Sequence, residues 1–252
     1  MKKILVLLIL FTFTTISANA KLSISPVRIE NSLPAGKSFE GYYILSNLGD
    51  NTISVEISLT TSDNKNTDWI NFNSNLVTVE PKSKAEAKFT IHIPESASGV
   101  LIARINFYEK PVDTSGSPIT FTISSPIYIS IKGTEIYKAN IQNISILNSP
   151  KTSFLINIAN TGNVHIRPKG NIVIQKTEPP VPEYAEEYKI IFNQSQSVVL
   201  PGATRDLIGS FDDQINLPDG SYKASINIEY KENDWISEEI IFEVDGGIAI
   251  IR

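Results

Sequence analysis

Apolar and polar side chains alternate along residues 119–132, which read ITFTISSPIYISIK. Except for Ser125, the odd positions are apolar, whereas the even positions are Thr, Ser, Pro, Tyr and Lys. Such alternation is typical of a β-strand with one apolar and one wet face. At about 3.3 Å per residue the segment would reach roughly 45 Å, well beyond the usual five or six residues. The pattern therefore predicts an unusually long strand.

Pro126 lies inside this segment and has no N–H to give to a ladder, which points to an edge strand. A long apolar edge is an aggregation hazard unless its purpose is to pair with another chain. The same alternation also suits a strand whose odd face lies in its own core. The local pattern allows both interpretations, and we assign Ile127–Ile131 mostly to the core.

Similar alternating runs recur along the rest of the chain and are closed by Asn, Gly, Asp, Pro or Ser, for example at residues 53–59, 85–93 and 222–230. Helical periodicity is nearly absent. Short alternating strands separated by turn residues are typical of all-β sandwiches.

Three landmarks occur in the same order in both halves of the chain. The first is an apolar strand ending in Asn-x-Gly, at residues 42–51 and 154–163. The second is a strand closed by a Pro-containing turn, at residues 77–85 and 198–206. The third is a Gly-x-x-x-Ala-x-Ile-Asn run, at residues 99–106 and 220–227. The spacing from proline to glycine is also nearly equal in the two halves. The repeat predicts two tandem immunoglobulin-like modules, at residues 21–133 and 134–252.

Residues 1–20 have the pattern of a cleaved secretory signal peptide: a basic start, an apolar run and an Ala-Asn-Ala site. We therefore expect an exported, periplasmic protein without a permanent membrane span. The formal net charge is −5 for the whole chain, and no basic tract is present, which argues against a nucleic-acid partner. The chain has no cysteine, which excludes disulfides, thiolate zinc sites and cysteine catalysis.

Residues suited to catalysis are scarce. The two histidines, His92 and His165, fall in different predicted modules, whereas a metal site or a hydrolytic triad needs converging groups. We interpret both as surface or capping residues. No nucleophile elbow, phosphate loop or zinc-protease motif occurs. We expect neither enzyme activity nor a cofactor. A carbohydrate-active enzyme would need a carboxylate pair facing a cleft.

The segments SISPVRIE, SNLGDN, WINFNSNLVTVEPKSKAEAKFTIHIP and GVLIARINFYEKP, in this order, are similar to the PapD-like periplasmic chaperones of pilus assembly. The likeness spans the mature chain, and the first module carries it best. It implies a non-catalytic chaperone that binds exported pilin-type subunits by β-strand donation, with an outer-membrane usher as a further partner.

The resemblance also implies subunit-binding residues. Ile119, Phe121 and Ile123 would be the donor side chains on the last strand of the first module. That family clamps the subunit's terminal carboxylate with an Arg and a Lys, and Arg28 falls where the Arg is expected. Lys132 is the candidate for the Lys, although a gap-free comparison puts Tyr128 there. On local sequence alone, Arg28 equally suits a surface or salt-bridge role.

A second hypothesis is a secreted or cell-envelope structural or adhesive protein. Tandem immunoglobulin-like domains also occur in bacterial surface proteins, and LPAGKSFEGYYILSNLGDN has some likeness to these. Tight association with cell wall or glycan would favour this alternative.

Overall fold

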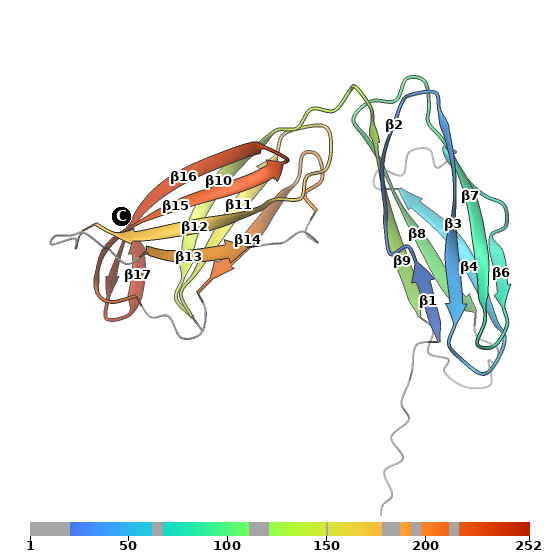
Figure 1. Ribbon diagram of the computed structural model, residues 1–252, viewed down its shortest axis with the longest axis horizontal. Coiled ribbons are helices and arrows are strands. Elements are labelled where there is room, and N and C mark those ends of the chain that lie inside the picture. Colours follow the sequence, from blue (N-terminus) through green and yellow to red (C-terminus); the bar gives the residue numbers. More distant parts are fainter. Residues whose placement is uncertain are drawn as a thin grey trace, which may run out of the picture.

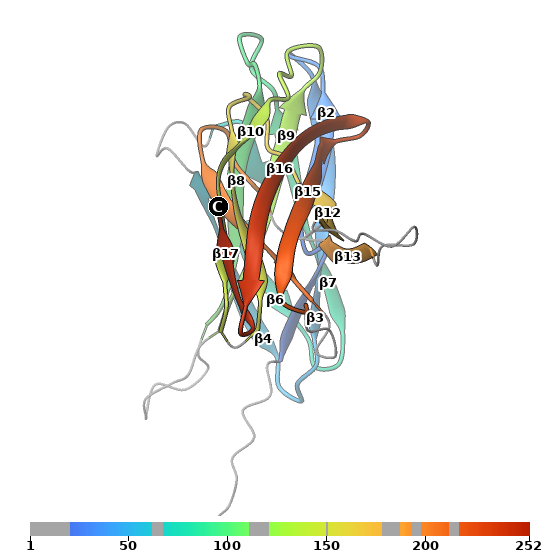
Figure 2. The same cartoon turned by 90° about the vertical axis from the view of Figure 1, so that its left-hand side faces the viewer.

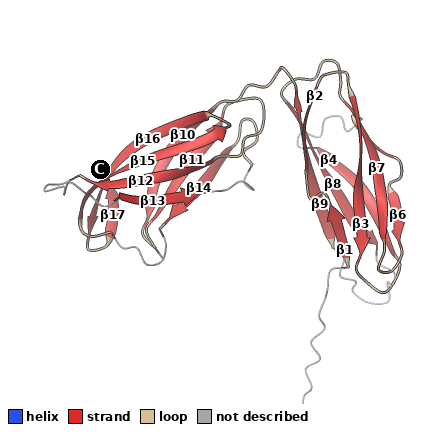
Figure 3. Cartoon of the chain, in the orientation of Figure 1, coloured by secondary structure: helices blue, strands red, loops and turns tan. Residues whose placement is uncertain are grey.

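The computed structural model describes residues 21–61, 68–110, 121–149, 151–177, 187–192, 198–211 and 217–252. Every helix or strand within these ranges is a β-strand, as Figure 3 shows, which confirms the predicted all-β class. No helix long and apolar enough to cross a membrane occurs among these residues. The predicted signal peptide lies outside the described residues. The strands form two groups, joined by a connection at the top of Figure 1.

The first group is a sandwich of two sheets, with strand orders β1-β3-β7-β5 and β2-β9-β8-β4-β6. Its strands are β1 (Leu22–Ser25), β2 (Ile29–Leu33), β3 (Ser38–Asn47), β4 (Ile53–Thr61), β5 (Ile70–Phe72), β6 (Leu76–Val79), β7 (Lys84–His92), β8 (Val100–Lys110) and β9 (Thr122–Ile131). The chain crosses from one sheet to the other between β1 and β2, around Pro26. After this crossing, β2 runs parallel to β9, whereas β8 pairs with β9 in the antiparallel sense.

The second group is also a two-sheet sandwich, with strand orders β10-β11-β14 and β13-β12-β15-β16-β17. Its strands are β10 (Ala139–Leu147), β11 (Ser153–Asn160), β12 (Lys169–Lys176), β13 (Glu187–Phe192), β14 (Thr204–Ser210), β15 (Gly220–Lys231), β16 (Asp234–Asp245) and β17 (Ile248–Ile251). Figure 2 shows the long hairpin of β15 and β16, which are antiparallel. The prediction of two tandem β-sandwiches is therefore confirmed.

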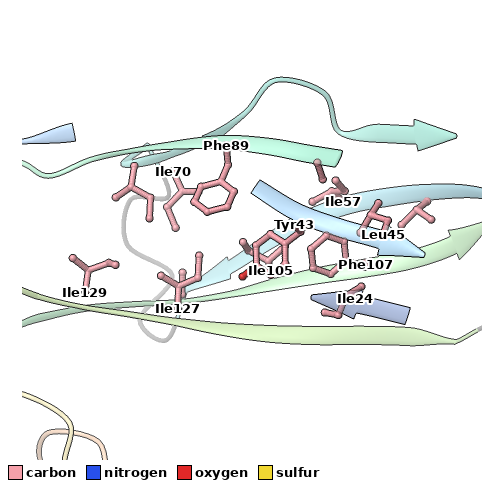
Figure 4. Packing of buried hydrophobic residues seen from close by; sticks show 14 of the residues in the cluster. Ile24, Tyr43, Leu45, Ile57, Ile70, Phe89, Ile105, Phe107, Ile127 and Ile129 are labelled. Atoms are coloured by element: carbon pink, nitrogen blue, oxygen red, sulfur yellow. The ribbon is translucent and has the colours of Figure 1, made fainter. Parts of the chain in front are cut away.

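An aromatic cluster lies at the centre of the first sandwich (Figure 4). The ring of Tyr43 lies 5.6 Å from that of Phe89 and 4.9 Å from that of Phe107, between centroids, and all three residues are at most 2% exposed. Burying one such side chain stabilises the fold by about 1.5–3 kcal/mol. The Tyr43 hydroxyl lies 2.9 Å from Ser125 Oγ, which donates to the carbonyl of Val27 at 3.0 Å. This chain of bonds fixes the backbone just before β2.

The repeated Asn-x-Gly motifs form the same buried plug in both sandwiches. The amide of Asn47 donates to the carbonyls of Val79, Asn51 and Glu80, and its oxygen accepts from the Gly49 N–H. Asn160 does the same with the carbonyls of Val164 and Val199 and with the N–H of Gly162. Both asparagines are 1% exposed. The sequence repeat therefore marks a structural element that each sandwich uses to tie a strand end to a neighbouring turn.

The two sandwiches have separate cores. The buried apolar residues of the first lie between Leu22 and Ile131, and those of the second between Ala139 and Ala249. We propose to place the domain boundary at residues 133–134, as the sequence repeat suggests, since no buried core residue falls between Ile131 and Ala139.

Candidate functional site

The edge of β9 that faces away from β8 is paired along only half of its length. β8 pairs with β9 from Thr122 to Ser130, whereas β2 pairs with it only from Ile127 to Ile131. Within the described part of the chain, the segment Thr122–Pro126 therefore has a ladder partner on one side only. The prediction of an edge strand holds for this half of β9 and not for the half that β2 covers.

The ladder pattern tells which backbone groups face the open edge. The N–H of Glu109 donates to the carbonyl of Phe121 at 3.4 Å, so residue 121 points its backbone groups toward β8. In an antiparallel pair this direction alternates from residue to residue. The N–H and C=O groups of Thr122 and Ser124 therefore point outward, ahead of the residues that β2 covers. These groups are available to an added strand.

Apolar side chains beside this edge become more buried along β9. Phe121 is 39% exposed, Ile123 is half-buried against the first core, and Ile127, Ile129 and Ile131 are fully buried. The expectation that Ile127–Ile131 serve the module's own core agrees with this burial. Ile119, the third predicted donor residue, lies outside the described residues.

The face of β9 that points away from the first core is not exposed to solvent along its whole length. Tyr128 and Ser130 are only 7% exposed, although the alternation predicts both for the polar face. Residues of the second sandwich cover this face: the ring of His165 stacks on that of Tyr128 at 4.5 Å between centroids. The side chain of His165 is only 13% exposed and lies in the contact between the sandwiches, so its interpretation as a surface or capping residue is wrong.

A cluster of cationic and imidazole side chains surrounds the carboxylate of Glu30, on β2. Arg167 donates to Glu30 Oε1 through Nε at 2.8 Å and also through Nη2. His165 Nε2 lies 3.2 Å from the same oxygen, and Arg28 Nε lies 3.3 Å from Glu30 Oε2. The Arg167 guanidinium also lies over the Tyr128 ring, 5.7 Å from its centroid. Arg28 comes from the first sandwich, and His165 and Arg167 come from the second.

The environment of the cluster sets its protonation. Burial raises the pKa of Glu30, but the hydrogen bond and charge of Arg167, together with His165 and Arg28, outweigh it and lower that pKa overall. Burial lowers the pKa of His165, against the opposing effect of Glu30. His165 is therefore neutral at pH 7. Its Nδ1 atom is buried without a hydrogen-bond partner among the described residues, which places the proton on Nε2, facing Glu30.

The structure does not bring Lys132 to Arg28. Ile29 lies opposite Ile127 and Leu33 opposite Ile131, so Arg28 and Lys132 lie at opposite ends of the β2–β9 pairing. Lys132 is exposed, and its N–H donates to the carbonyl of Leu33 at 2.9 Å. Tyr128, opposite Glu30, is the β9 residue beside the cluster. Arg167, which sequence reasoning missed, supplies the second guanidinium.

A cleft of about 800 Å³ lies between the two sandwiches. Its lining includes Glu30 and Ser130 of the first sandwich and Arg167, Lys169 and Lys231 of the second. Figure 1 shows β2 and β9 on the side of the first sandwich that is nearest to the second. The Glu30 cluster therefore forms part of the wall of this cleft.

Asn163, from the second sandwich, binds the backbone of the segment that connects the two sandwiches. Its side chain accepts from the Ile136 N–H at 2.7 Å and donates to the Thr134 carbonyl at 2.9 Å. The Thr134 hydroxyl in turn accepts from the N–H of Gly99 at 2.8 Å. These bonds and the Glu30–Arg167 pair are two separate attachments between the sandwiches. In the described ranges, no group of three or more His, Cys, Asp or Glu side chains could hold a metal ion.

Comparisons with known proteins give structural matches only. No family model matches the chain, and no curated protein matches it. Solved structures that are similar include the YadV chaperone, with 15% identity, a TM-score of 0.46, and coverage of 88% of this chain and 100% of that one. The E. coli chaperone DraB matches with 11% identity, a TM-score of 0.46, and coverage of 89% and 98%. A Salmonella enterica SafA pilin complex with the SafB chaperone matches with 8% identity, a TM-score of 0.44, and coverage of 86% and 95%.

Proposed function

We propose that this chain is a non-catalytic periplasmic chaperone that binds and stabilises exported, pilin-type subunits by β-strand donation. The half-open edge of β9 carries the proposal, because its outward backbone groups at Thr122 and Ser124 suit an added strand. Phe121 and Ile123 supply apolar side chains for a groove in the subunit. In the alternating sequence, Ile119 occupies the same kind of odd-numbered position as Phe121 and Ile123, and it would add a third apolar side chain to this set.

The position of Arg28 fits the end of such an added strand. β2 begins at Ile29 and runs parallel to β9, so a strand added in line with β2 on Thr122–Pro126 would run in the same direction. Its carboxyl terminus would then reach the start of β2, next to Arg28. A guanidinium binds a carboxylate through two parallel hydrogen bonds. The edge and Arg28 would thus recognise two adjoining parts of one subunit, with Arg167 in place of the expected lysine.

Co-expression with exported candidate subunits tests the proposal, with Phe121→Asp as the decisive variant. The matched control is Leu76→Asp, because Leu76 is a 51% exposed residue on β6, at the opposite edge of the same sheet. We expect Phe121→Asp to weaken the complex by about 30-fold or more, as for a central apolar anchor, and Leu76→Asp to leave it intact. Complexes that survive both Phe121→Asp and Arg28→Ala would refute the proposal.

The backbone part of the recognition has its own test. Ser124→Pro removes an N–H that faces the open edge, so the pairing with β8 is kept while a bond to the added strand is lost. The control Ser124→Ala keeps this N–H and loses only the hydroxyl, which donates to Asn106 Oδ1 at 2.7 Å. Weaker subunit binding is expected for the proline variant alone. Equal binding of both variants would argue against strand addition at this edge.

One observation favours the alternative of a cell-envelope adhesive protein. A shallow hollow of about 240 Å³ on the second sandwich is lined by Trp235 and Ile191, which are 51% and 73% exposed, beside Lys169 and Glu229. An exposed tryptophan flanked by polar groups is a suitable surface for a partner. Loss of binding to isolated cell wall in Trp235→Ala, with Phe121→Asp unaffected, would favour this alternative over the chaperone.

A further inference from the structure

The carboxylate of Glu30 already occupies the place where a ligand carboxylate would meet the two arginines. Arg28 binds one of its oxygens and Arg167 the other, with two donors from Arg167 on Oε1. His165 adds its Nε2 to the same oxygen. These are charge-assisted hydrogen bonds and ion pairs of the kind by which guanidinium groups hold a carboxylate, although both Arg167 donors share one oxygen here. The resident side chain therefore marks a working carboxylate site between the two sandwiches.

The site is open to exchange. The side chains of Arg28, Glu30 and Arg167 are 35%, 29% and 19% exposed, so Glu30 can turn to water without leaving a sealed interior. Glu30 and Arg167 also line the cleft between the sandwiches, from which a ligand would enter. The ring of Tyr128 supports the Arg167 guanidinium from β9, independently of Glu30. Arg167 therefore keeps one of its partners when Glu30 departs.

We infer that Glu30 is an intramolecular competitor for the terminal carboxylate of a bound subunit, which displaces it from Arg28 and Arg167. This inference rests on the proposed chaperone function and adds a control to its binding site. Because one carboxylate replaces another, the hydrogen bonds that form are nearly equivalent to those that break. The outcome then depends on effective concentration, which for a tethered group is of the order of millimolar.

The competition would favour one kind of ligand. A free acid at low concentration cannot match a tethered glutamate, whereas a subunit already paired with Thr122–Pro126 presents its own terminus at a similar local concentration. Because Arg28 directly precedes β2, that terminus would lie within reach. Displacement also replaces the Glu30–Arg167 attachment by the bound terminus, which would join Arg28 of the first sandwich to Arg167 of the second. Glu30 thereby makes carboxylate binding conditional on strand pairing.

A titration with a small probe tests the competition without any subunit. N-acetylphenylalanine and its amide are titrated into the wild-type chain, Glu30→Gln and Glu229→Gln, and the side-chain Nε–H resonance of Arg167 is followed by NMR. Glu229→Gln is the matched control, because Glu229 lines the same cleft and binds Lys169 at 2.9 Å rather than Arg167. We expect Glu30→Gln to bind the acid about tenfold more tightly than the wild type and not to bind the amide. Glu229→Gln should behave as the wild type.

A second arginine variant separates competition from a general loosening of the fold. The gain in Glu30→Gln should disappear when Arg167→Gln is added, because the site itself is then lost; in this double variant the Nε–H resonance of Arg28, the other guanidinium of the cluster, is followed instead. Equal affinities of the wild type and Glu30→Gln for the acid, or an equal gain for the amide, would overturn the inference. Since the probe has no strand, either result leaves strand donation standing. Conversely, a failed Phe121→Asp test with a positive titration would reject strand donation and keep the carboxylate site.

Discussion

Replacing the buried plug residue Asn47 by alanine should destabilise the first sandwich selectively. Asn47 is 1% exposed and makes four hydrogen bonds to backbone groups, at 2.8–3.1 Å. Two of these bonds, to the Val79 carbonyl and from the Gly49 N–H, are buried. The other two, to the carbonyls of Asn51 and Glu80, are partly buried. In the alanine variant, the carbonyls of Asn51 and Glu80 can turn to water and the Val79 carbonyl keeps its ladder partner Ile53, whereas the buried Gly49 N–H loses its partner.

The size of the effect follows from the buried Gly49 N–H. An unsatisfied buried donor costs about 1–3 kcal/mol, so the loss of unfolding free energy should be about 1–3 kcal/mol. This is a large share of the roughly 5–15 kcal/mol that stabilises an ordinary domain. Asn106→Ala is the matched control, because Asn106 is also an asparagine on a strand, but its hydrogen bonds go to side chains and are exposed. For this control we expect a change within about 0.5 kcal/mol.

Tryptophan fluorescence allows the first sandwich to be followed alone. The chain has two tryptophans: Trp69 in the first core, 7% exposed, and Trp235 on the surface of the second sandwich. In a Trp235→Phe background, urea unfolding reported by Trp69 should shift its midpoint down by about 0.5–1.5 M in Asn47→Ala, for an m-value near 2 kcal/mol/M. Asn160→Ala, in the second plug, should leave this transition in place. A shift in Asn47→Ala no larger than in Asn106→Ala would refute the reasoning.

Three further predictions concern the joint and the titrating groups. Gly99→Ala should lower the melting temperature more than Gly133→Ala: both have positive φ, at 72° and 88°, but only at Gly99 would the new Cβ meet a described atom, the Asn163 carbonyl oxygen at 2.6 Å. The folded-state pKa of Glu30 is lowered, so the stabilisation that its carboxylate gives to the contact between the sandwiches is present above about pH 4.3. This stabilisation is lost as pH falls through the lowered pKa. A distance between cysteine-attached spin labels across the joint should therefore broaden only in acid. Burial raises the pKa of Tyr43 to about 12, so the urea midpoint of the first sandwich should fall as pH rises from about 10 to 12, and Tyr43→Phe should abolish this fall.

The inner face of β9 could be predicted from the sequence because its burial has a local cause. Period-two alternation places Ile127, Ile129 and Ile131 on one side of any strand, and a single sandwich core is enough to bury that side. The outer face depends on partners far away in the chain. Tyr128 is buried by His165 of the second sandwich, and the alternation contains no information about that contact. The length of the unpaired segment of β9 likewise depends on the residue at which β2 begins to pair with it. Pro26 and Pro126 indicate a bend and a strand edge, but they do not specify that residue.

The second cation of the cluster shows where sequence reasoning reaches its limit. A search along the last strand of the first sandwich leads to Lys132, which the parallel register of β2 and β9 places at the far end of the pairing from Arg28. His165 and Arg167 flank the buried Ile166, so their alternation predicts that both side chains point the same way. Which surface they meet is decided by the arrangement of the two sandwiches, and the structure brings both to Glu30. Because one arginine comes from each sandwich, carboxylate binding at this site depends on how the sandwiches are held together. A variant that loosens the joint, such as Gly99→Ala, should therefore weaken carboxylate binding even though Gly99 makes no contact with Glu30 among the interactions described.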